Sequence, residues 1–179
     1  NPDYYFSVDG PGATYYVSSS EGCDPNDGYG PCADESGCSN DGLSELAPFK
    51  TFQCAMGVAY TDMRILFKRG DVWTTSTGAT INVEGPGMLG AYGNLLEPKP
   101  LIQFTGTGGV LSMANANDWC IVDIDFQGTN FQGSGITGTG SNSLYLRLGF
   151  SNFESGFIQA TAPPKEGVAI TDSVFSNNF

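Results

Sequence analysis

Three stretches of this chain share one pattern: WCIVDIDF at residues 119–126, SLYLRLGF at 143–150 and VAITDSVF at 168–175. Each stretch ends in phenylalanine and has an apolar or aromatic residue five positions earlier. The phenylalanines are 24 and then 25 residues apart. A repeat of this length, made of short strands and turns rich in Gly and Asn, is typical of a solenoid.

The repeat predicts stacked parallel coils rather than an antiparallel meander. The short apolar runs are not joined by two-residue turns such as Asn-Gly, which would indicate hairpins. In a stack, each strand would lie about 4.8 Å from its equivalent in the next coil. Ile121, Tyr145 and Ile170 would then form one inward column, and the three phenylalanines would form another.

The composition favours an all-β domain. The 179 residues fit one domain with a sizeable core. A charged fraction of only 15% and 25 glycines favour strands and turns over helices. The net charge of −12 would repel nucleic acid and anionic membrane surfaces, and also a polyanionic glycan unless a divalent cation bridged it. The sequence contains no run of about 18 apolar residues, so it predicts no membrane-spanning segment.

Five cysteines indicate an oxidising environment. Cys23, Cys32 and Cys38 lie in a loop rich in turn residues, and Cys54 follows closely, whereas Cys120 lies alone in an apolar run. Four cysteines plus one buried thiol fit a secreted protein with two disulfides whose connectivity stays open. A zinc site is the alternative, but the spacings contain no Cys-x₂-Cys pair and the chain has no His.

The N-terminal third combines an extension, the cysteine loop and one predicted helix. The chain starts at Asn1 without an initiator Met, which suggests a processed product. Residues 1–13 are expected to be an extension or docking strand that precedes a single β-domain over 14–179. Residues 48–60 have apolar residues at helical spacing, with Pro48 at an early position. A helix there would cap the open end of the solenoid.

Several motifs occur in an order that points to a known fold. They are Tyr15-Tyr16-Val17-Ser18, Asn40-Asp41-Gly42, residues 47–52, residues 67–73, Gly90-Ala91-Tyr92-Gly93 and residues 99–102. This series resembles the N-terminal half of secreted right-handed parallel β-helix proteins of the pectate-lyase-like superfamily. The resemblance implies a right-handed, single-stranded parallel β-helix with a short capping helix and a disulfide-stapled loop. The superfamily includes polysaccharide lyases, glycoside hydrolases and surface proteins, so the fold alone does not decide the function.

The end of the chain departs from that family pattern. The sequence stops at Asn177-Asn178-Phe179, in the middle of a predicted coil, whereas the family usually continues for several more coils. We therefore expect a β-helix that is incomplete at its C-terminus. Either the polypeptide is a fragment, or another chain covers the open end.

The phase of the repeat predicts an outward column made of Asp123, Arg147 and Asp172, each three residues before a phenylalanine. The resemblance implies a lyase chemistry in which a basic residue near acidic calcium ligands removes a proton from the sugar ring. These three residues are the candidate catalytic set. The alternative is a surface ladder of charges that holds the coils in register and contributes little per exposed pair.

Two further sites are candidates. Asp123 and Asp125 could form the carboxylate pair of a glycoside hydrolase, although exposed acids on strands are common. Asp24, Asp27 and Asp41 could bind calcium, which prefers oxygen ligands in flexible loops. Their Asp-Gly and Asn-Asp-Gly contexts are also typical of simple turns.

Two functions follow from these observations. The first is a secreted β-helix protein that binds or acts on extracellular polysaccharide; as an enzyme it would be a lyase or a glycoside hydrolase. The alternative is a structural or adhesive surface protein that forms fibres with other copies of itself, because contacts between open ends that do not close produce filaments. The expected location is extracellular or at the cell surface.

Overall fold

In the computed structural model of the chain, the structure describes residues 12–22, 40–113, 116–129, 131–138, 140–158 and 166–178. These residues form fifteen β-strands and one short helix. All strand pairs that join the described elements are parallel. The predicted all-β class and the predicted parallel pairing are therefore confirmed.

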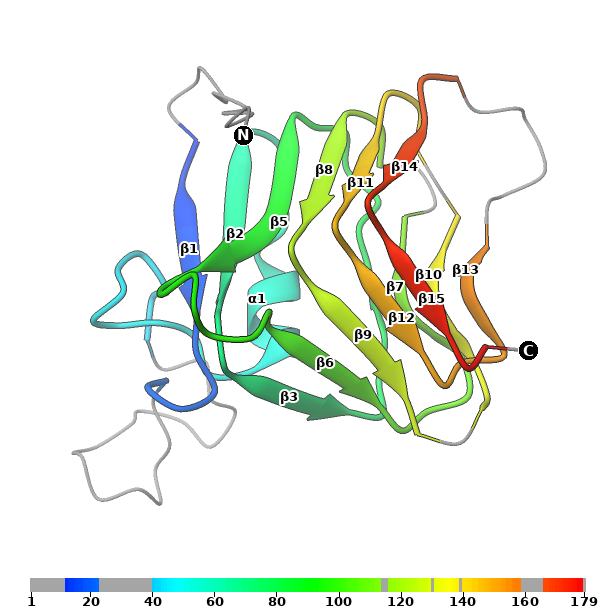
Figure 1. Cartoon of the computed structure of the whole chain (residues 1–179). Helices are drawn as coiled ribbons and strands as arrows, with labels where there is room; N and C mark the ends of the chain where they lie inside the picture. Colours follow the sequence, from blue (N-terminus) through cyan, green and yellow to red (C-terminus); the bar gives the residue numbers. More distant parts are fainter. Residues whose placement is uncertain are drawn as a thin grey trace.

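The strands form three parallel sheets that the chain visits in turn (Figure 1). The first sheet contains β1 (Thr14–Val17), β2 (Met63–Lys68), β5 (Gly87–Tyr92), β8 (Trp119–Val122), β11 (Leu144–Leu146) and β14 (Ala169–Thr171). The second sheet contains β3 (Val72–Thr75), β6 (Leu101–Phe104), β9 (Asp125–Gly128), β12 (Gly149–Ser151) and β15 (Val174–Ser176). The third sheet contains β4 (Ala79–Thr80), β7 (Gly109–Ser112), β10 (Ser134–Thr137) and β13 (Ser155–Ile158).

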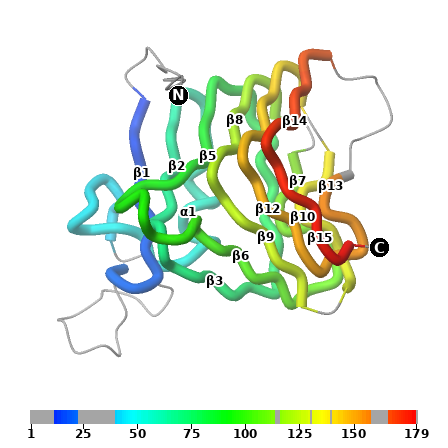
Figure 2. The backbone as a smooth tube through the Cα atoms, in the orientation of Figure 1, coloured from blue at the N-terminus to red at the C-terminus, as the bar shows by residue number. Residues whose placement is uncertain are grey.

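One strand from each sheet makes a coil, and the described chain makes four complete coils from β2 to β13 (Figure 2). Side chains alternate between the interior and the outside, as the burial pattern of β6 and β9 shows. This alternation follows from the pleat of a strand, in which successive side chains point to opposite faces. The solenoid predicted from the repeat is therefore present.

The two predicted columns occupy the interior. Tyr145 pairs with Ile121 on one side and Ile170 on the other, in register. The rings of Phe126 and Phe150 stack with centroids 5.5 Å apart, and those of Phe150 and Phe175 are 5.0 Å apart. Stacking at this distance adds to the free energy gained by burying the rings.

The helix is shorter than predicted. Helix α1 spans Phe52–Gly57, and Thr51 caps it by accepting a hydrogen bond from the Cys54 backbone N–H. The expected start near Pro48 is wrong because Phe49 is extended and forms a bridge with Val17. Thr51 has an extended backbone and a side-chain acceptor, which is the preferred chemistry at the first position outside a helix.

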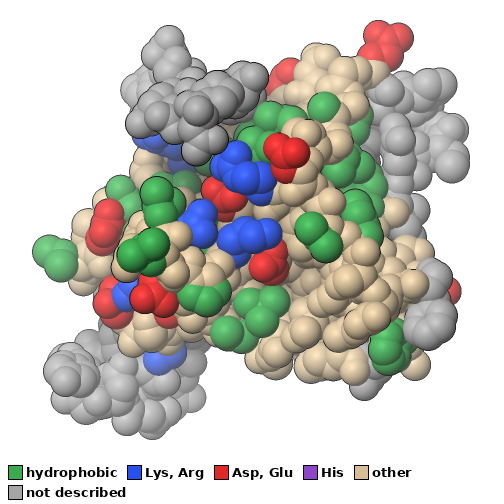
Figure 3. Space-filling view, viewed as in Figure 1, with side chains coloured by type: hydrophobic (Ala, Val, Ile, Leu, Met, Phe, Trp, Pro, Cys, Tyr) green, Lys and Arg blue, Asp and Glu red, His purple; other side chains and the backbone are tan. Residues whose placement is uncertain are grey.

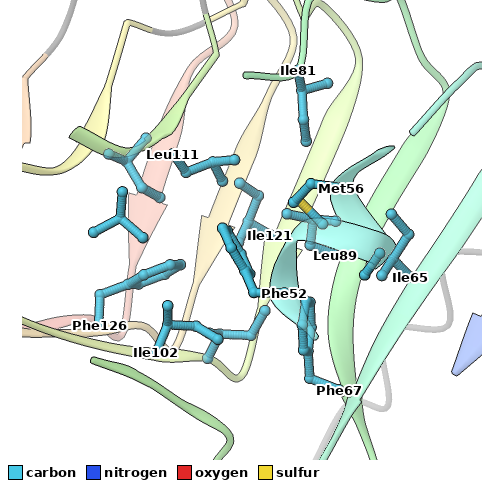
Figure 4. Close-up of a cluster of buried hydrophobic side chains, with 14 of the residues drawn as sticks. Phe52, Met56, Ile65, Phe67, Ile81, Leu89, Ile102, Leu111, Ile121 and Phe126 are labelled. Atoms are coloured by element: carbon cyan, nitrogen blue, oxygen red, sulfur yellow. The ribbon is translucent and has the colours of Figure 1, made fainter. Parts of the chain in front are cut away.

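Helix α1 lies at the N-terminal end of the solenoid (Figure 1). Phe52 and Met56 point into the core beside Leu89 and Phe67 (Figure 4). The rings of Phe52 and Phe67 are 6.1 Å apart. Within the described residues, no helix has the length and apolar character needed to cross a membrane.

A buried carboxylate fastens β1 to the first complete coil. Asp71 accepts hydrogen bonds from the Ser18 hydroxyl at 2.7 Å, from the Ser20 hydroxyl at 2.7 Å and from the Ser20 backbone N–H at 3.2 Å. Asp71 begins the stretch that leads into β3, where Trp73 is buried and donates from its indole to the Lys50 carbonyl at 2.9 Å.

The cysteine loop is described only in part. Cys54 is disulfide-bonded. Cys120 is a free thiol, so no disulfide joins the two described cysteines. Cys23, Cys32 and Cys38 lie outside the described residues, so the stapled loop stays a prediction. Residues 1–11 also lie outside the described part, and the proposed N-terminal extension stays a prediction for the same reason.

Candidate functional site at the corner between two sheets

The three predicted column residues lie on one corner of the solenoid. Asp123 joins β8 to β9, Arg147 joins β11 to β12, and Asp172 joins β14 to β15. Their φ angles are 58°, 53° and 50°, so each residue has a left-handed backbone. One left-handed residue interrupts the strand and turns the chain from the first sheet to the second. Because the turn repeats in these three successive coils, their side chains meet outside it.

Asp123 is the centre of an ion-pair cluster at this corner. Its Oδ1 accepts from Arg147 Nε at 2.7 Å and its Oδ2 accepts from Arg147 Nη2 at 2.9 Å, in a two-pronged contact. Arg69 Nη2 lies 3.1 Å from the same Oδ2. Arg69 follows β2, two coils before Asp123, and Gly93 occupies the corner of the coil between them.

A lysine ties the neighbouring coils together. Lys99 Nζ lies 2.6 Å from Asp125 Oδ1 and donates to the Arg147 carbonyl at 2.9 Å. Arg69, Lys99, Asp123, Asp125 and Arg147 are called the corner cluster below. Figure 3 shows Lys and Arg side chains beside Asp and Glu side chains over the middle of this face.

The charges of the corner cluster reinforce one another. Burial alone would raise the pKa of Asp123, but hydrogen bonds from Arg147 and the charges of Arg147, Arg69 and Lys99 outweigh it and lower that pKa. The hydrogen bond to Asp123 raises the pKa of Arg147, and the charge of Asp172 adds to this effect. Asp123 and Arg147 are therefore both ionised at neutral pH.

These protonation states decide what the pair can do. A general base must accept a proton near the working pH, and the Arg147 guanidinium stays protonated. A general acid must carry a proton, and the pKa of Asp123 is lowered rather than raised. The pair is thus built to offer donors and acceptors in fixed positions. The predicted catalytic role of Asp123, Arg147 and Asp172 stays a prediction.

The residues of the other predicted sites lie in different surroundings. Asp123 and Asp125, the predicted glycosidase pair, each face a cation: Asp123 contacts the two arginines and Asp125 contacts Lys99. Asp41 is exposed and its Oδ1 accepts from the Leu43 backbone N–H at 2.9 Å, which is a turn contact. Asp24 and Asp27 lie outside the described residues. Within the described part, no group of three or more acidic or Cys side chains is placed to hold a metal ion.

Sequence reasoning missed a row of polar side chains beside the corner cluster. On the outer face of the second sheet, Thr74 Oγ1 donates to Gln103 Oε1 at 3.2 Å, and Gln103 Nε2 donates to Gln127 Oε1 at 2.9 Å. Ser151 and Ser176 continue the row in register. These five residues are called the glutamine row. Gln103 and Gln127 are 24 residues apart, the same spacing as Phe126 and Phe150. The repeat could therefore have predicted that the two glutamines align on neighbouring coils.

Arg69 and Lys99 were also missed. Each lies one or two coils away from the carboxylate that it contacts, and each approaches from a segment with no repeat pattern of its own. The only available signal was their motif context, residues 67–73 and 99–102, which we used for the fold.

Comparison with known proteins gives the fold. No protein-family model and no curated protein matches the chain. The solved structure of the native GH136 lacto-N-biosidase from Eubacterium ramulus is similar, with a TM-score of 0.69, 18% sequence identity and coverage of 92% of this chain. Its selenomethionine derivative gives a TM-score of 0.68 at the same identity and coverage.

This similarity confirms the parallel β-helix architecture. A sequence identity of 18% shows the fold and carries no conclusion about function. The chain spans about a third of the length of that enzyme, since the match covers 34% of it. The similar protein is a glycoside hydrolase, so the fold found here also serves as a carbohydrate-acting scaffold elsewhere.

Proposed function

We propose that this chain is a β-helix portion of an extracellular protein that binds polysaccharide. The corner cluster carries the proposal, because it holds charged donors and acceptors in fixed positions across four coils. Arg147 has a side chain 48% exposed, and Asp123 holds its guanidinium by two hydrogen bonds. Lys99 and Asp125 offer a second donor and acceptor pair beside it. Sugar hydroxyl groups both donate and accept, so paired groups of this kind suit them.

The similar glycoside hydrolase supports this proposal at the level of the scaffold. That enzyme is a lacto-N-biosidase and is about three times as long as the matched region. Whether the present chain also cleaves glycans is a separate proposal. A lyase would release unsaturated sugars that absorb ultraviolet light, and a hydrolase would release reducing ends.

Affinity electrophoresis against a panel of soluble glycans tests binding. We expect retardation by at least one polysaccharide and a weaker effect after Asp123→Asn, which removes the charge that holds Arg147 while Asn still accepts a left-handed backbone. Asp118→Asn is the matched control, because Asp118 is exposed and left-handed at φ 59° but lies at another corner. No retardation by any glycan, or equal loss in both variants, would contradict the proposal.

Calcium and secretion remain proposals of their own. Calcium binding would require the loop residues Asp24, Asp27 and Asp41, and titration calorimetry with calcium chloride tests it directly. Secretion is supported by the cysteine content, because two disulfides would persist only in an oxidising compartment.

One observation favours the alternative, self-assembling function. Ile170 and Phe175 point inward by register, yet they are 42% and 49% exposed. Exposed core positions in a terminal coil can pair with further coils of the same polypeptide or with a second molecule. Sedimentation of the polypeptide over a range of concentrations distinguishes these cases.

A further inference from the structure

We propose that the glutamine row on the outer face of the second sheet binds an extended, uncharged glycan chain that runs along the solenoid axis. This inference rests on the proposed function and adds the orientation, the charge class and the residues that contact the ligand. It does not require the corner cluster to be catalytic.

The direction of the row sets the direction of the ligand. Gln103 pairs with Gln127, Gln127 with Ser151, and Ser151 with Ser176, each in the same register on neighbouring strands. Neighbouring strands are about 4.8 Å apart, so five strands present a row of about 19 Å along the solenoid. Thr74 and Ser176 are exposed at the two ends of this row. A ligand on it can therefore be an internal segment of a longer chain.

The side-chain amides are held in position before any ligand binds. Gln103 accepts from Thr74 and donates to Gln127, which fixes the orientation of both groups. Each amide has two N–H donors and two acceptor lone pairs, and the row uses only part of this capacity. The remaining groups can bind sugar hydroxyls without a large loss of side-chain freedom, which lowers the entropic cost of binding.

The neighbouring positions leave the row accessible and provide apolar contact. Val72 and Leu101 lie in register beside it, and Val72 is 45% exposed. Gly149 lies beneath the Asp125 carboxylate, since a Cβ there would be 2.5 Å from Asp125 Oδ1. The Asp125–Lys99 pair thus borders the row, and the aliphatic side chains can contact the C–H faces of sugar rings.

The charge of this face favours a neutral ligand. The five residues of the row are uncharged, and the surface over β9, β12 and β15 is mostly free of charged side chains (Figure 3). The adjacent cations are already paired: Arg147 and Arg69 with Asp123, and Lys99 with Asp125. The chain as a whole carries −12, which repels polyanions.

The test measures affinity against glycan length and charge. Oligomers of glucose, of N-acetylglucosamine and of galacturonate, each from disaccharide to octasaccharide, are titrated into the full chain by calorimetry. We expect affinity for a neutral series to rise about tenfold from disaccharide to tetrasaccharide, as more of the row is covered. We also expect little change when the salt concentration is raised severalfold, because no charge is neutralised.

Two variants assign the binding to the row. Gln127→Ala should weaken binding of the longer neutral oligomers about fivefold to tenfold, and Gln103→Ala should act similarly. Asn82→Ala is the control, because Asn82 is exposed in the segment between β4 and β5. Thermal unfolding of each variant checks that the fold is retained, and a variant that does not fold is replaced by Gln127→Glu, which keeps the shape but adds a charge.

The outcomes separate this inference from the proposed function. Glycan binding that falls with Asp123→Asn but not with Gln127→Ala or Gln103→Ala would refute the row and leave polysaccharide binding standing. Affinity that does not depend on chain length, or that is higher for galacturonate and falls with salt, would also refute it. Absence of binding to all three series and to the glycan panel would overturn both.

Discussion

Asp123 links residues that come from three different coils. Arg69 approaches from the coil of β2 and Arg147 from the coil of β11, while Asp123 lies between β8 and β9. The left-handed backbone of Asp123 matters as much as its charge, because it places the carboxylate on the outside of the corner. Asp and Asn tolerate this backbone better than most residues. Arg147 has the same backbone with a long side chain, and its contact with Asp123 compensates for that cost.

Replacing Asp123 by Asn should lower stability in a pH-dependent way. The pKa of Asp123 is lowered in the folded protein, so its contribution is present above the pKa of about 3.9 expected for an unfolded Asp, and is lost as the pH falls through the folded value. We expect Asp123→Asn to reduce the free energy of unfolding by about 1 kcal/mol at pH 7, since Arg147 is half exposed. Urea unfolding at neutral and acidic pH measures this. A difference that does not shrink on acidification would contradict the ion-pair account.

The Cys120 thiol should be unreactive in the folded protein. Burial raises the pKa of this thiol to about 11, although the nearby charge of Arg147 partly opposes the increase. Only a small fraction is then thiolate at pH 8, and the thiolate is the reactive form. We expect slow alkylation by iodoacetamide in the native state and fast alkylation after unfolding.

Peptide mapping of the same alkylated sample tests the cysteine loop. If Cys23, Cys32, Cys38 and Cys54 form two disulfides, only Cys120 is alkylated in unfolded, non-reduced protein. Two or more alkylated cysteines under those conditions would contradict the two-disulfide prediction.

At the scale of secondary-structure elements, the stacked phenylalanine rings hold the strands of the second sheet together from the inside. Phe150 is 1% exposed and stacks on a ring at each side, whereas Phe175 at the end of the column is 49% exposed. The same ring therefore has two environments one coil apart. The two positions allow a direct comparison of buried and terminal packing in one column.

Phe150→Ala should reduce the free energy of unfolding by about 3–5 kcal/mol, because it leaves a cavity between two rings. Phe175→Ala is the matched control and should cost about 1 kcal/mol, since half of that ring is already in water. Denaturant unfolding compares them. Equal losses would mean that the column is not packed as described.

The attachment of β1 is a second element-scale feature. Asp71 accepts three hydrogen bonds from Ser18 and Ser20, and Ser18 is fully buried. Removing the acceptor leaves these donors unsatisfied. We expect Asp71→Ala to destabilise the protein by about 2–3 kcal/mol and to expose residues 18–22 to proteases. Limited proteolysis with mass spectrometry checks the site. Cleavage elsewhere before residues 18–22 would show that Asp71 does not control this contact.

At the scale of the whole molecule, the two ends of the described solenoid present different chemistry. Helix α1 covers the interior at the N-terminal end, whereas β14 and β15 are edge strands whose inward residues Ile170 and Phe175 are exposed. Unpaired strand edges with apolar side chains favour association with another strand.

A polypeptide of these residues should therefore associate reversibly as its concentration rises. Ile170→Lys combined with Phe175→Lys should shift it towards monomer, because both charges lie on the exposed end of the core. Analytical ultracentrifugation measures the shift, with Leu96→Lys as a control at a loop residue 92% exposed. Monomer at all concentrations for the unmodified chain would contradict association through this coil.

The repeat was predictable from sequence because a solenoid is built from contacts between neighbouring coils. The 24- and 25-residue spacing placed Phe126, Phe150 and Phe175 in one column, and the phase of the repeat placed Asp123 and Arg147 on one corner. The start of the helix was not predictable in the same way. Phe49 has an apolar spacing that suits a helix, but pairing with Val17 satisfies its backbone groups as a strand.

The sequence by itself determined the parallel coils and the inward columns, because side-chain direction follows from the two-residue period of a strand. The phase of the repeat predicted the outward position of Asp123, Arg147 and Asp172, where a left-handed backbone turns the side chain out of the corner. The tertiary structure alone decided that Arg69 and Lys99 join this corner and that Gln103 and Gln127 bond along the second sheet. These contacts depend on how far side chains reach across coils and on where the segment between β5 and β6 returns. A repeat period does not specify either quantity, since both are set by packing in three dimensions.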